Sequence, residues 1–197
     1  MGDLTLITGG ARSGKSAFAE SLAARSGLPV TYIATLDTTL DTTGELLDEE
    51  MRDRIARHRA RRPATWRTIE ASSDTGSDLA AAVTSAADGD AILLDCIAVW
   101  TSNRLLALRD EQPPPAALAA LGEALAHDLA AFLGGVTARR GPAIVVTNEV
   151  GDGLVPPYAL GRAYRDLLGR VNQQLSHAAR QAYLVVAGRP LPLPPPF

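Results

Sequence analysis

The chain has 197 residues, a length at which one domain buries a sizeable core without disulfides or metal ions to hold it together. Its formal net charge of −3 gives no general attraction for nucleic acid, and its single cysteine, Cys96, excludes a disulfide within the chain. We expect a cytoplasmic protein, because a single cysteine fits a reducing compartment. We also find neither a signal peptide nor an apolar run of about 18 residues that would span a membrane.

The first predicted element is a strand over residues 4–8, and a glycine-rich loop with the pattern G-x-x-x-x-G-K-[ST] follows it directly. A helix predicted over 15–25 completes a phosphate-binding loop, whose backbone N–H groups turn toward a polyphosphate. We expect Lys15 to contact the β- and γ-phosphates and Ser16 to coordinate Mg²⁺; a glycine-rich turn that binds nothing is the alternative. The loop residues are Gly9, Gly10, Ala11, Arg12, Ser13, Gly14, Lys15 and Ser16.

Along the rest of the chain, short β-branched runs alternate with longer segments rich in Ala, Leu, Arg and Glu. This alternation predicts an α/β fold with a mostly parallel sheet and helices on both faces. Strands are expected over 4–8, 30–34, 66–69, 91–95, 143–147 and 183–187, and helices over 15–25, 48–61, 77–87, 98–108, 116–138 and 158–179.

A cluster of positive charge lies within residues 51–62, where six arginines face one acid. On a helix, Arg54, His58 and Arg62 fall at i, i+4 and i+8 and share one face. Such a face suits a phosphate, and His58 in it can act as a proton shuttle or as a nucleophile toward phosphorus. A solvated basic helix face is the alternative. His127 and His177 are interpreted as surface or core-edge residues.

Acidic residues follow two predicted strands. Asp95 ends the apolar run 91–95, as the carboxylate beside a phosphate loop does when it holds the Mg²⁺ shell; the alternative is an aspartate that caps the next helix. Glu149 follows Asn148 after the strand over 143–147, and we expect it to face the same crevice as a water-orienting residue or base. A structural role for Asn148 and Glu149 is as well supported. Cys96 is interpreted as a packing residue.

Two stretches and the tail are predicted to be irregular. Residues 36–47 are rich in Thr, Asp and Gly and are expected to form a mobile surface loop, and residues 110–115, with three prolines, are expected to form a connector. We expect one domain over 1–189 and a proline-rich tail over 190–197, which cannot enter a sheet ladder and lies extended on the surface.

Taken together and in order, these segments resemble the bifunctional adenosylcobinamide kinase/adenosylcobinamide-phosphate guanylyltransferase family. The most specific are the loop Gly-Gly-Ala-Arg-Ser-Gly-Lys-Ser and the stretch over 50–70 that holds Arg54, His58 and Arg62. The remaining segments of the resemblance are 32–35, 93–96, 146–156 and 170–173.

The resemblance implies two reactions. ATP or GTP phosphorylates the aminopropanol hydroxyl of adenosylcobinamide, and GTP then transfers GMP to adenosylcobinamide phosphate through a guanylylated histidine, here His58. It also implies a RecA-like P-loop fold and a trimer, with Mg²⁺ as cofactor. The implied nucleotide contacts, besides the phosphate loop 9–16, are Ala34, Thr35, Leu36, Arg59, Ala60, Arg61, Arg62, Glu70 and Asp95.

Two other functions fit the phosphate loop by itself. One is a different P-loop kinase or ATPase of small molecules, which would use Lys15, Ser16 and Asp95 and leave His58 idle. The other is a nucleotide-dependent switch protein that senses GTP without turnover.

Overall fold

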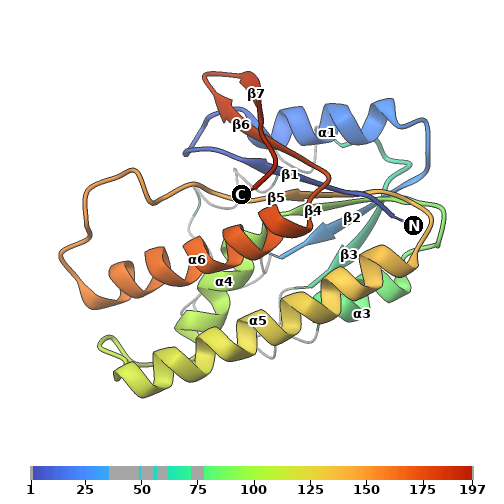
Figure 1. Ribbon diagram of the computed structural model, residues 1–197. Coiled ribbons are helices and arrows are strands. Elements are labelled where there is room, and N and C mark those ends of the chain that lie inside the picture. The colour runs from blue at the N-terminus through green and yellow to red at the C-terminus, as the bar shows by residue number, and fades with distance from the viewer. Residues whose placement is uncertain (1, 36–48, 50–55, 57–61, 72–77, 197) are drawn as a thin grey trace.

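A computed structural model describes residues 2–35, 49, 56, 62–71 and 78–196 (Figure 1). The helix expected over 48–61 lies outside this part except for Glu49 and Ala56, and the irregular segment expected over 36–47 lies outside it entirely. The elements, in chain order, are β1 Leu4–Thr8, α1 Lys15–Arg25, β2 Val30–Ala34, β3 Arg67–Glu70, α3 Asp78–Ser85, β4 Ala91–Asp95, α4 Ile97–Leu106, α5 Pro115–Ala138, β5 Ala143–Val146, α6 Ala159–Ala178, β6 Gln181–Val186 and β7 Arg189–Leu193.

The seven strands form one sheet in the order β3-β2-β4-β5-β1-β6-β7. Every neighbouring pair is parallel except β6 with β7. Parallel neighbours cannot be joined by a tight turn, so the chain crosses over between them, mostly through helices. The predicted mostly parallel α/β sheet is confirmed.

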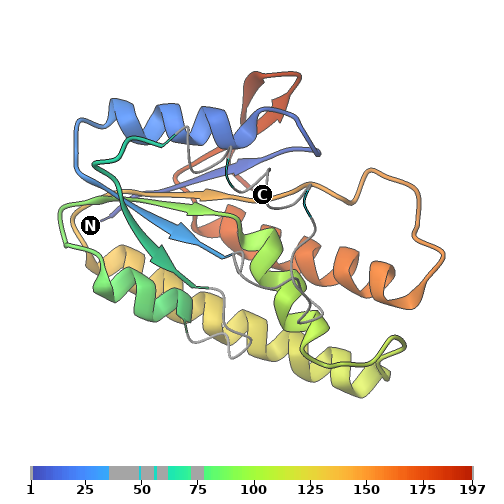
Figure 2. The same cartoon turned by 180° about the vertical axis from the view of Figure 1, so that it is seen from behind.

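Helices cover both faces of the sheet, as the sequence predicts. Helix α1 lies on one face, and α3, α4, α5 and α6 lie on the other (Figures 1 and 2). Strand β4 is buried from both sides: Ile92 and Leu94 pack with the larger group of helices, and Ala91 and Leu93 pack on the side of α1. This double burial explains why the strand has a continuous apolar run instead of an alternating one.

Helix α5 is the most apolar helix in the described part. Its residues Leu121, Leu125, Leu129, Phe132 and Val136 recur every three or four positions and are buried against the sheet and its neighbouring helices. By length and composition alone α5 could cross a membrane, contrary to the expectation that no run is long and apolar enough. This is weak evidence for a span, because the core helix of a soluble protein passes the same test.

The expectation that the proline-rich tail cannot enter a ladder is wrong. Strand β7 pairs antiparallel with β6, with Pro190 opposite Val185 and Pro192 opposite Tyr183. The pairing is tolerated because β7 is the edge strand of the sheet. The backbone nitrogens of residues two apart face the same side of a strand, so both proline nitrogens can face away from β6 while Leu191, opposite Leu184, keeps its N–H toward β6.

Candidate functional site

The phosphate loop connects β1 to α1 in the predicted way. Gly9 and Gly14 have φ angles of +156° and +96°, and Arg12, a non-glycine residue, has a φ of +57°. A Cβ at Gly9 would come within 2.5 Å of the Val185 carbonyl oxygen and 2.8 Å of Ser13 Oγ. Glycine is therefore required at Gly9 both for its backbone conformation and for space.

Polar groups converge on the inside of this loop. The Lys15 ammonium donates to the Gly10 carbonyl oxygen at 3.0 Å, and the Ser13 hydroxyl is buried without a hydrogen-bond partner among the described residues. Helix α1 starts at Lys15, so its unpaired N–H groups and the positive end of its dipole point into the loop. The arrangement is suited to bind a polyphosphate.

The sheet register brings the other predicted residues to the same edge. Ala34 on β2 pairs with Glu70 on β3 and with Asp95 on β4, Asp95 pairs with Val146 on β5, and Val146 pairs with Ile7 on β1. All five residues therefore lie in one row at the carboxyl ends of parallel strands, just before the phosphate loop. Below, the catalytic edge means the carboxyl ends of these parallel strands together with the loops that follow them, and the opposite edge means their amino ends. Neither term refers to the outer strands of the sheet.

Asp95 is not the N-cap residue of α4. The N-cap position of α4 is Cys96, and it has no side-chain cap bond. Thr35 holds Cys96 in place: its hydroxyl donates to the Cys96 carbonyl oxygen at 2.7 Å and accepts from the Cys96 N–H at 3.1 Å. Asn103 on α4 donates to the Thr35 carbonyl oxygen at 3.0 Å. These bonds hold the backbone next to Asp95, from which its carboxylate projects.

The charges of Asp95 and Lys15 both act on the thiol of Cys96, so both residues lie near it. Burial, and next the negative charge of Asp95, raise the pKa of the Cys96 thiol to about 12, while the charge of Lys15 opposes the shift. Cys96 also packs against the core on the side of α1. Its interpretation as a packing residue is confirmed, since a neutral thiol is a poor nucleophile.

Arg62 lies beside this group. Its guanidinium stacks over the ring of Tyr32, with its central carbon 3.9 Å from the ring centroid. Tyr32 is buried on β2, and its hydroxyl donates to the Asp95 carbonyl oxygen at 3.5 Å. Burial, and next the charge of Asp95, raise the pKa of Tyr32 above its ordinary value, whereas Arg62 lowers it. A cation is thereby held on the ring face next to the catalytic edge.

Sequence analysis missed Tyr32 and Asn103 as site residues. Tyr32 lies in segment 32–35 of the family resemblance but belongs to a buried strand, and Asn103 belongs to a helix with an apolar face, so neither was assigned a role in the site. Asn103 could have been suspected only because it is a polar residue on the helix that directly follows Asp95.

The structure favours a structural role for Glu149 and Asn148. The Glu149 carboxylate accepts the Gly151 N–H at 2.6 Å and so closes its own turn. Asn172 on α6 donates to the Asn148 carbonyl oxygen at 3.0 Å and accepts from the Thr147 hydroxyl at 2.6 Å. The two Asn172 bonds tie the end of β5 to α6, and the bond from Gly151 engages one oxygen of the Glu149 carboxylate with the backbone.

Several predicted site residues lie outside the described part of the chain. They include the proposed nucleophile His58 and its partner on the helix face, Arg54. The others are Leu36, Arg59, Ala60 and Arg61.

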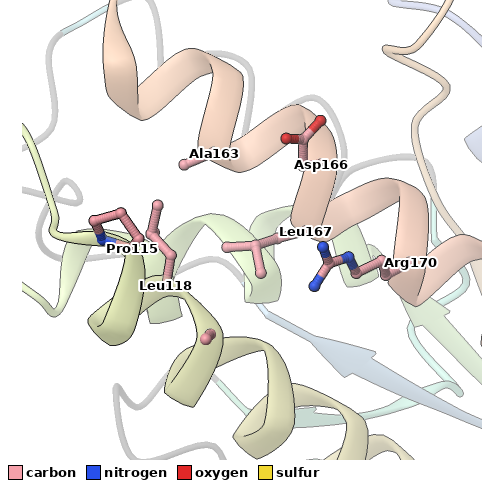
Figure 3. A pocket seen from close by; sticks show the side chains of 7 residues that line it. Pro115, Leu118, Ala163, Asp166, Leu167 and Arg170 are labelled. Atoms are coloured by element: carbon pink, nitrogen blue, oxygen red, sulfur yellow. The ribbon is translucent and has the colours of Figure 1, made fainter.

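A separate shallow hollow of about 240 Å³ lies between α5 and α6 (Figure 3). Leu118 and Leu167 line its apolar side, and Asp166 and Arg170 project from successive turns of α6 at its rim. It includes none of the predicted site residues.

Known proteins match this chain over nearly its whole length. The family described as cobinamide kinase/cobinamide phosphate guanyltransferase matches residues 5–193. The bifunctional adenosylcobalamin biosynthesis protein CobU of Salmonella typhimurium is 40% identical over 186 residues, which are 94% of this chain and 96% of that protein. The corresponding protein CobP of Pseudomonas aeruginosa is 42% identical over 189 residues, 95% of each chain.

A solved structure with low sequence identity has a similar fold. An ATPase from the type III secretion system of pathogenic bacteria superposes with a TM-score of 0.52 at 13% identity, covering 93% of this chain and 51% of that one. The similarity supports the RecA-like P-loop fold.

Proposed function

The chain belongs to the cobinamide kinase/cobinamide phosphate guanyltransferase family, and we propose that one nucleotide site at the catalytic edge serves both of its reactions. The protein phosphorylates the aminopropanol hydroxyl of adenosylcobinamide with ATP or GTP. It then transfers GMP from GTP to adenosylcobinamide phosphate, which yields adenosyl-GDP-cobinamide and pyrophosphate. The observation that supports the shared site is the row of strand ends, in which Asp95 at the end of β4 lies one strand away from β1, the strand that leads into the phosphate loop.

In the first reaction the hydroxyl oxygen of adenosylcobinamide attacks the γ-phosphorus. The bond from the γ-phosphorus to the β–γ bridging oxygen breaks, the nucleoside diphosphate leaves with that oxygen, and the hydroxyl proton passes to solvent. This chemistry depends on positioning and charge neutralisation, to which the phosphate loop and Lys15 contribute. The inward position of Lys15 and the buried hydroxyl of Ser13 support this role.

In the second reaction an imidazole nitrogen of His58 attacks the α-phosphorus of GTP, and pyrophosphate leaves. A phosphate oxygen of adenosylcobinamide phosphate then attacks the phosphorus of the guanylyl-histidine and releases the imidazole. The basic segment 59–62 contributes cations that stabilise the charge in both steps. Arg62, stacked on Tyr32 next to Asp95, supports this placement.

Ser16 and Asp95 would hold Mg²⁺ in this site. A hydroxyl and a carboxylate are oxygen donors, which this ion prefers, and nucleotide sites supply its remaining ligands from phosphates and water. When bound, the ion would neutralise charge on the phosphate oxygens.

We further propose a cytoplasmic trimer. The single cysteine supports a reducing compartment, and the resemblance to the family supports the trimer. Sedimentation equilibrium of the full chain gives the assembled mass directly, and a monomer mass would contradict the trimer.

GTP labelled at the α-phosphorus tests the second reaction. We expect acid-labile covalent label on the wild-type protein, no label on His58→Ala, and full label on the matched control His127→Ala, whose histidine is exposed on α5. Absence of label on the wild type would refute the guanylyl-histidine route.

The kinase reaction is tested separately. Wild type and His58→Ala should both convert adenosylcobinamide to its phosphate with Mg²⁺ and ATP or GTP, because the histidine is not needed for attack at the γ-phosphorus. No phosphorylated corrinoid from the wild type would refute the kinase.

A further inference from the structure

The loop over residues 150–158, between β5 and α6, exposes large apolar side chains to solvent. Leu154 is 97% exposed, Val155 66% and Tyr158 65%. Single exposed apolar residues are common on protein surfaces, but three within five residues form a local patch of the kind that marks interaction sites.

The backbone of this loop is held by two arginines of α6. Arg162 donates to the carbonyl oxygens of Pro156 and Pro157 at 3.1 and 2.8 Å. Arg165 donates to the carbonyl oxygens of Gly153, at 3.2 Å, and Gly151. Charged donors make strong hydrogen bonds, so the exposed side chains are presented by an ordered backbone.

A glycine in the first turn of α6 provides the seat for the end of the loop. A Cβ at Gly161 would come within 2.6 Å of the Tyr158 ring and 2.7 Å of Pro156 Cβ. The absence of a side chain at Gly161 therefore lets both residues rest on the helix. The loop that carries the exposed patch is therefore held in one conformation by its own contacts and is preorganised for a ligand.

The loop is continuous with the nucleotide site. Glu149, the residue directly before this loop, donates its N–H to the Gly9 carbonyl oxygen of the phosphate loop at 3.1 Å. The loop leaves the same end of the sheet as the phosphate loop and projects beyond it before the chain enters α6 (Figure 1). A ligand that rests on Leu154 and Val155 can therefore extend toward the phosphates.

We propose that the 150–158 loop is the docking platform for the corrinoid macrocycle of adenosylcobinamide, an inference that rests on the proposed function. The hydroxyl that receives the γ-phosphoryl group lies on an arm only a few bonds long, so the macrocycle must rest close to the catalytic edge. Its methyl-bearing rim offers apolar surface for Leu154, Val155 and Tyr158 to cover. The exposed carboxylate of Asp152 complements the positive charge of an alkyl-cobalt(III) corrin.

Equilibrium dialysis tests this platform, because bound adenosylcobinamide is measured by its visible absorbance without any turnover. The test variant is Leu154→Ser/Val155→Ser in the full chain. The matched control is Leu28→Ser, which removes a side chain that is 40% exposed before β2, at the opposite edge of the sheet. Labelling by α-labelled GTP, which needs no corrinoid, reports in parallel that each variant retains a working nucleotide site.

We expect the double variant to bind adenosylcobinamide at least about tenfold more weakly, with the KM for the corrinoid raised in proportion. The KM for GTP, the covalent label and the assembled mass should match those of the wild type and of Leu28→Ser.

Unchanged corrinoid affinity in the double variant overturns the proposal. A lowered assembled mass with unchanged corrinoid affinity also overturns it, and assigns the patch to a contact between copies of the chain. A wild type that binds adenosylcobinamide and transfers neither phosphoryl nor GMP refutes the proposed function alone, whereas a wild type that binds no corrinoid refutes the platform.

Discussion

The two edges of the sheet use polar groups in opposite ways. At the catalytic edge the Lys15 ammonium donates to the Gly10 carbonyl oxygen of its own loop at 3.0 Å, and the Ser13 hydroxyl is buried without a hydrogen-bond partner among the described residues. At the opposite edge, Arg139 is 5% exposed and donates to the carbonyl oxygens of Val83, Ala87 and Asp90 at 3.4, 2.6 and 2.7 Å.

Further polar pairs close that opposite edge. Thr31 donates to the Asp90 carboxylate at 2.8 Å, and Arg180 pairs with Asp3 at 2.7 Å across the start of β1. These side chains stabilise the fold through internal bonds, although the Arg139 Nε is buried without a hydrogen-bond partner among the described residues. At the catalytic edge Thr35 and Asn103 also bond internally, whereas the Ser13 hydroxyl of the phosphate loop is buried without such a bond. The comparison indicates that stability and chemistry are divided between the two ends of the same strands.

The largest effect should come from Lys15→Met. Both reactions should fall by about 100- to 1000-fold, because a positioned cation for the phosphates is lost. The midpoint of thermal unfolding should stay near the wild-type value, since Lys15 carries little of the packing. Steady-state assays of each reaction check this, with Arg25→Ala, a cation at the exposed end of α1, as the control. A large loss of stability in Lys15→Met would contradict the division between the edges.

The mirror experiment is Arg139→Met. Three carbonyl oxygens would lose a charged donor, so the free energy of unfolding should fall by about 2 to 4 kcal/mol, measured by urea denaturation. Both activities should persist where the variant is folded. Arg140→Ala is the control: its ion pair with Asp88 is exposed to solvent, so its loss should change the free energy of unfolding far less than the loss of Arg139. Equal effects of the two variants would contradict the role of Arg139.

Thr35→Val sharpens the comparison, because Thr35 lies at the catalytic edge and also makes internal hydrogen bonds that stabilise the fold. The change leaves the N–H and carbonyl of Cys96 without the hydroxyl that they share, and should destabilise the protein by about 1 to 3 kcal/mol. GTP affinity should also weaken, because the backbone before Asp95 is no longer held. Thr35→Ser retains the hydroxyl and should restore both properties. If GTP affinity does not change, Thr35 belongs with the stabilising groups alone.

The smallest effect concerns Cys96. Because burial raises its pKa to about 12, the native thiol should react slowly with a thiol reagent at pH 8 and at the ordinary rate after unfolding. The thiol ionises at lower pH in the unfolded chain, where its pKa is 9.0, than in the folded protein. The contribution of Cys96 to the free energy of unfolding is therefore complete below pH 9.0 and is lost as the pH rises toward 12. Reaction kinetics with and without urea check this, and rapid reaction of the native thiol would contradict it.

Local patterns predicted much of this molecule. Strands β1, β2 and β4 begin and end at the predicted residues because each is a short buried apolar run between turn residues. The phosphate loop was predictable for a similar reason, since its geometry depends on glycines at fixed spacing and not on distant contacts.

The sequence by itself therefore determined the order of strands β1 to β6 and of the described helices between them, the phosphate loop, and the family resemblance that the family match bears out. Only the tertiary structure decided that β5 lies between β1 and β4, that Glu149 bonds to its own turn, and that prolines 190 and 192 belong to a sheet. Strand order depends on pairing between residues far apart in the chain, and a proline in a ladder is tolerated only at an edge. Neither condition is visible in a local window of sequence.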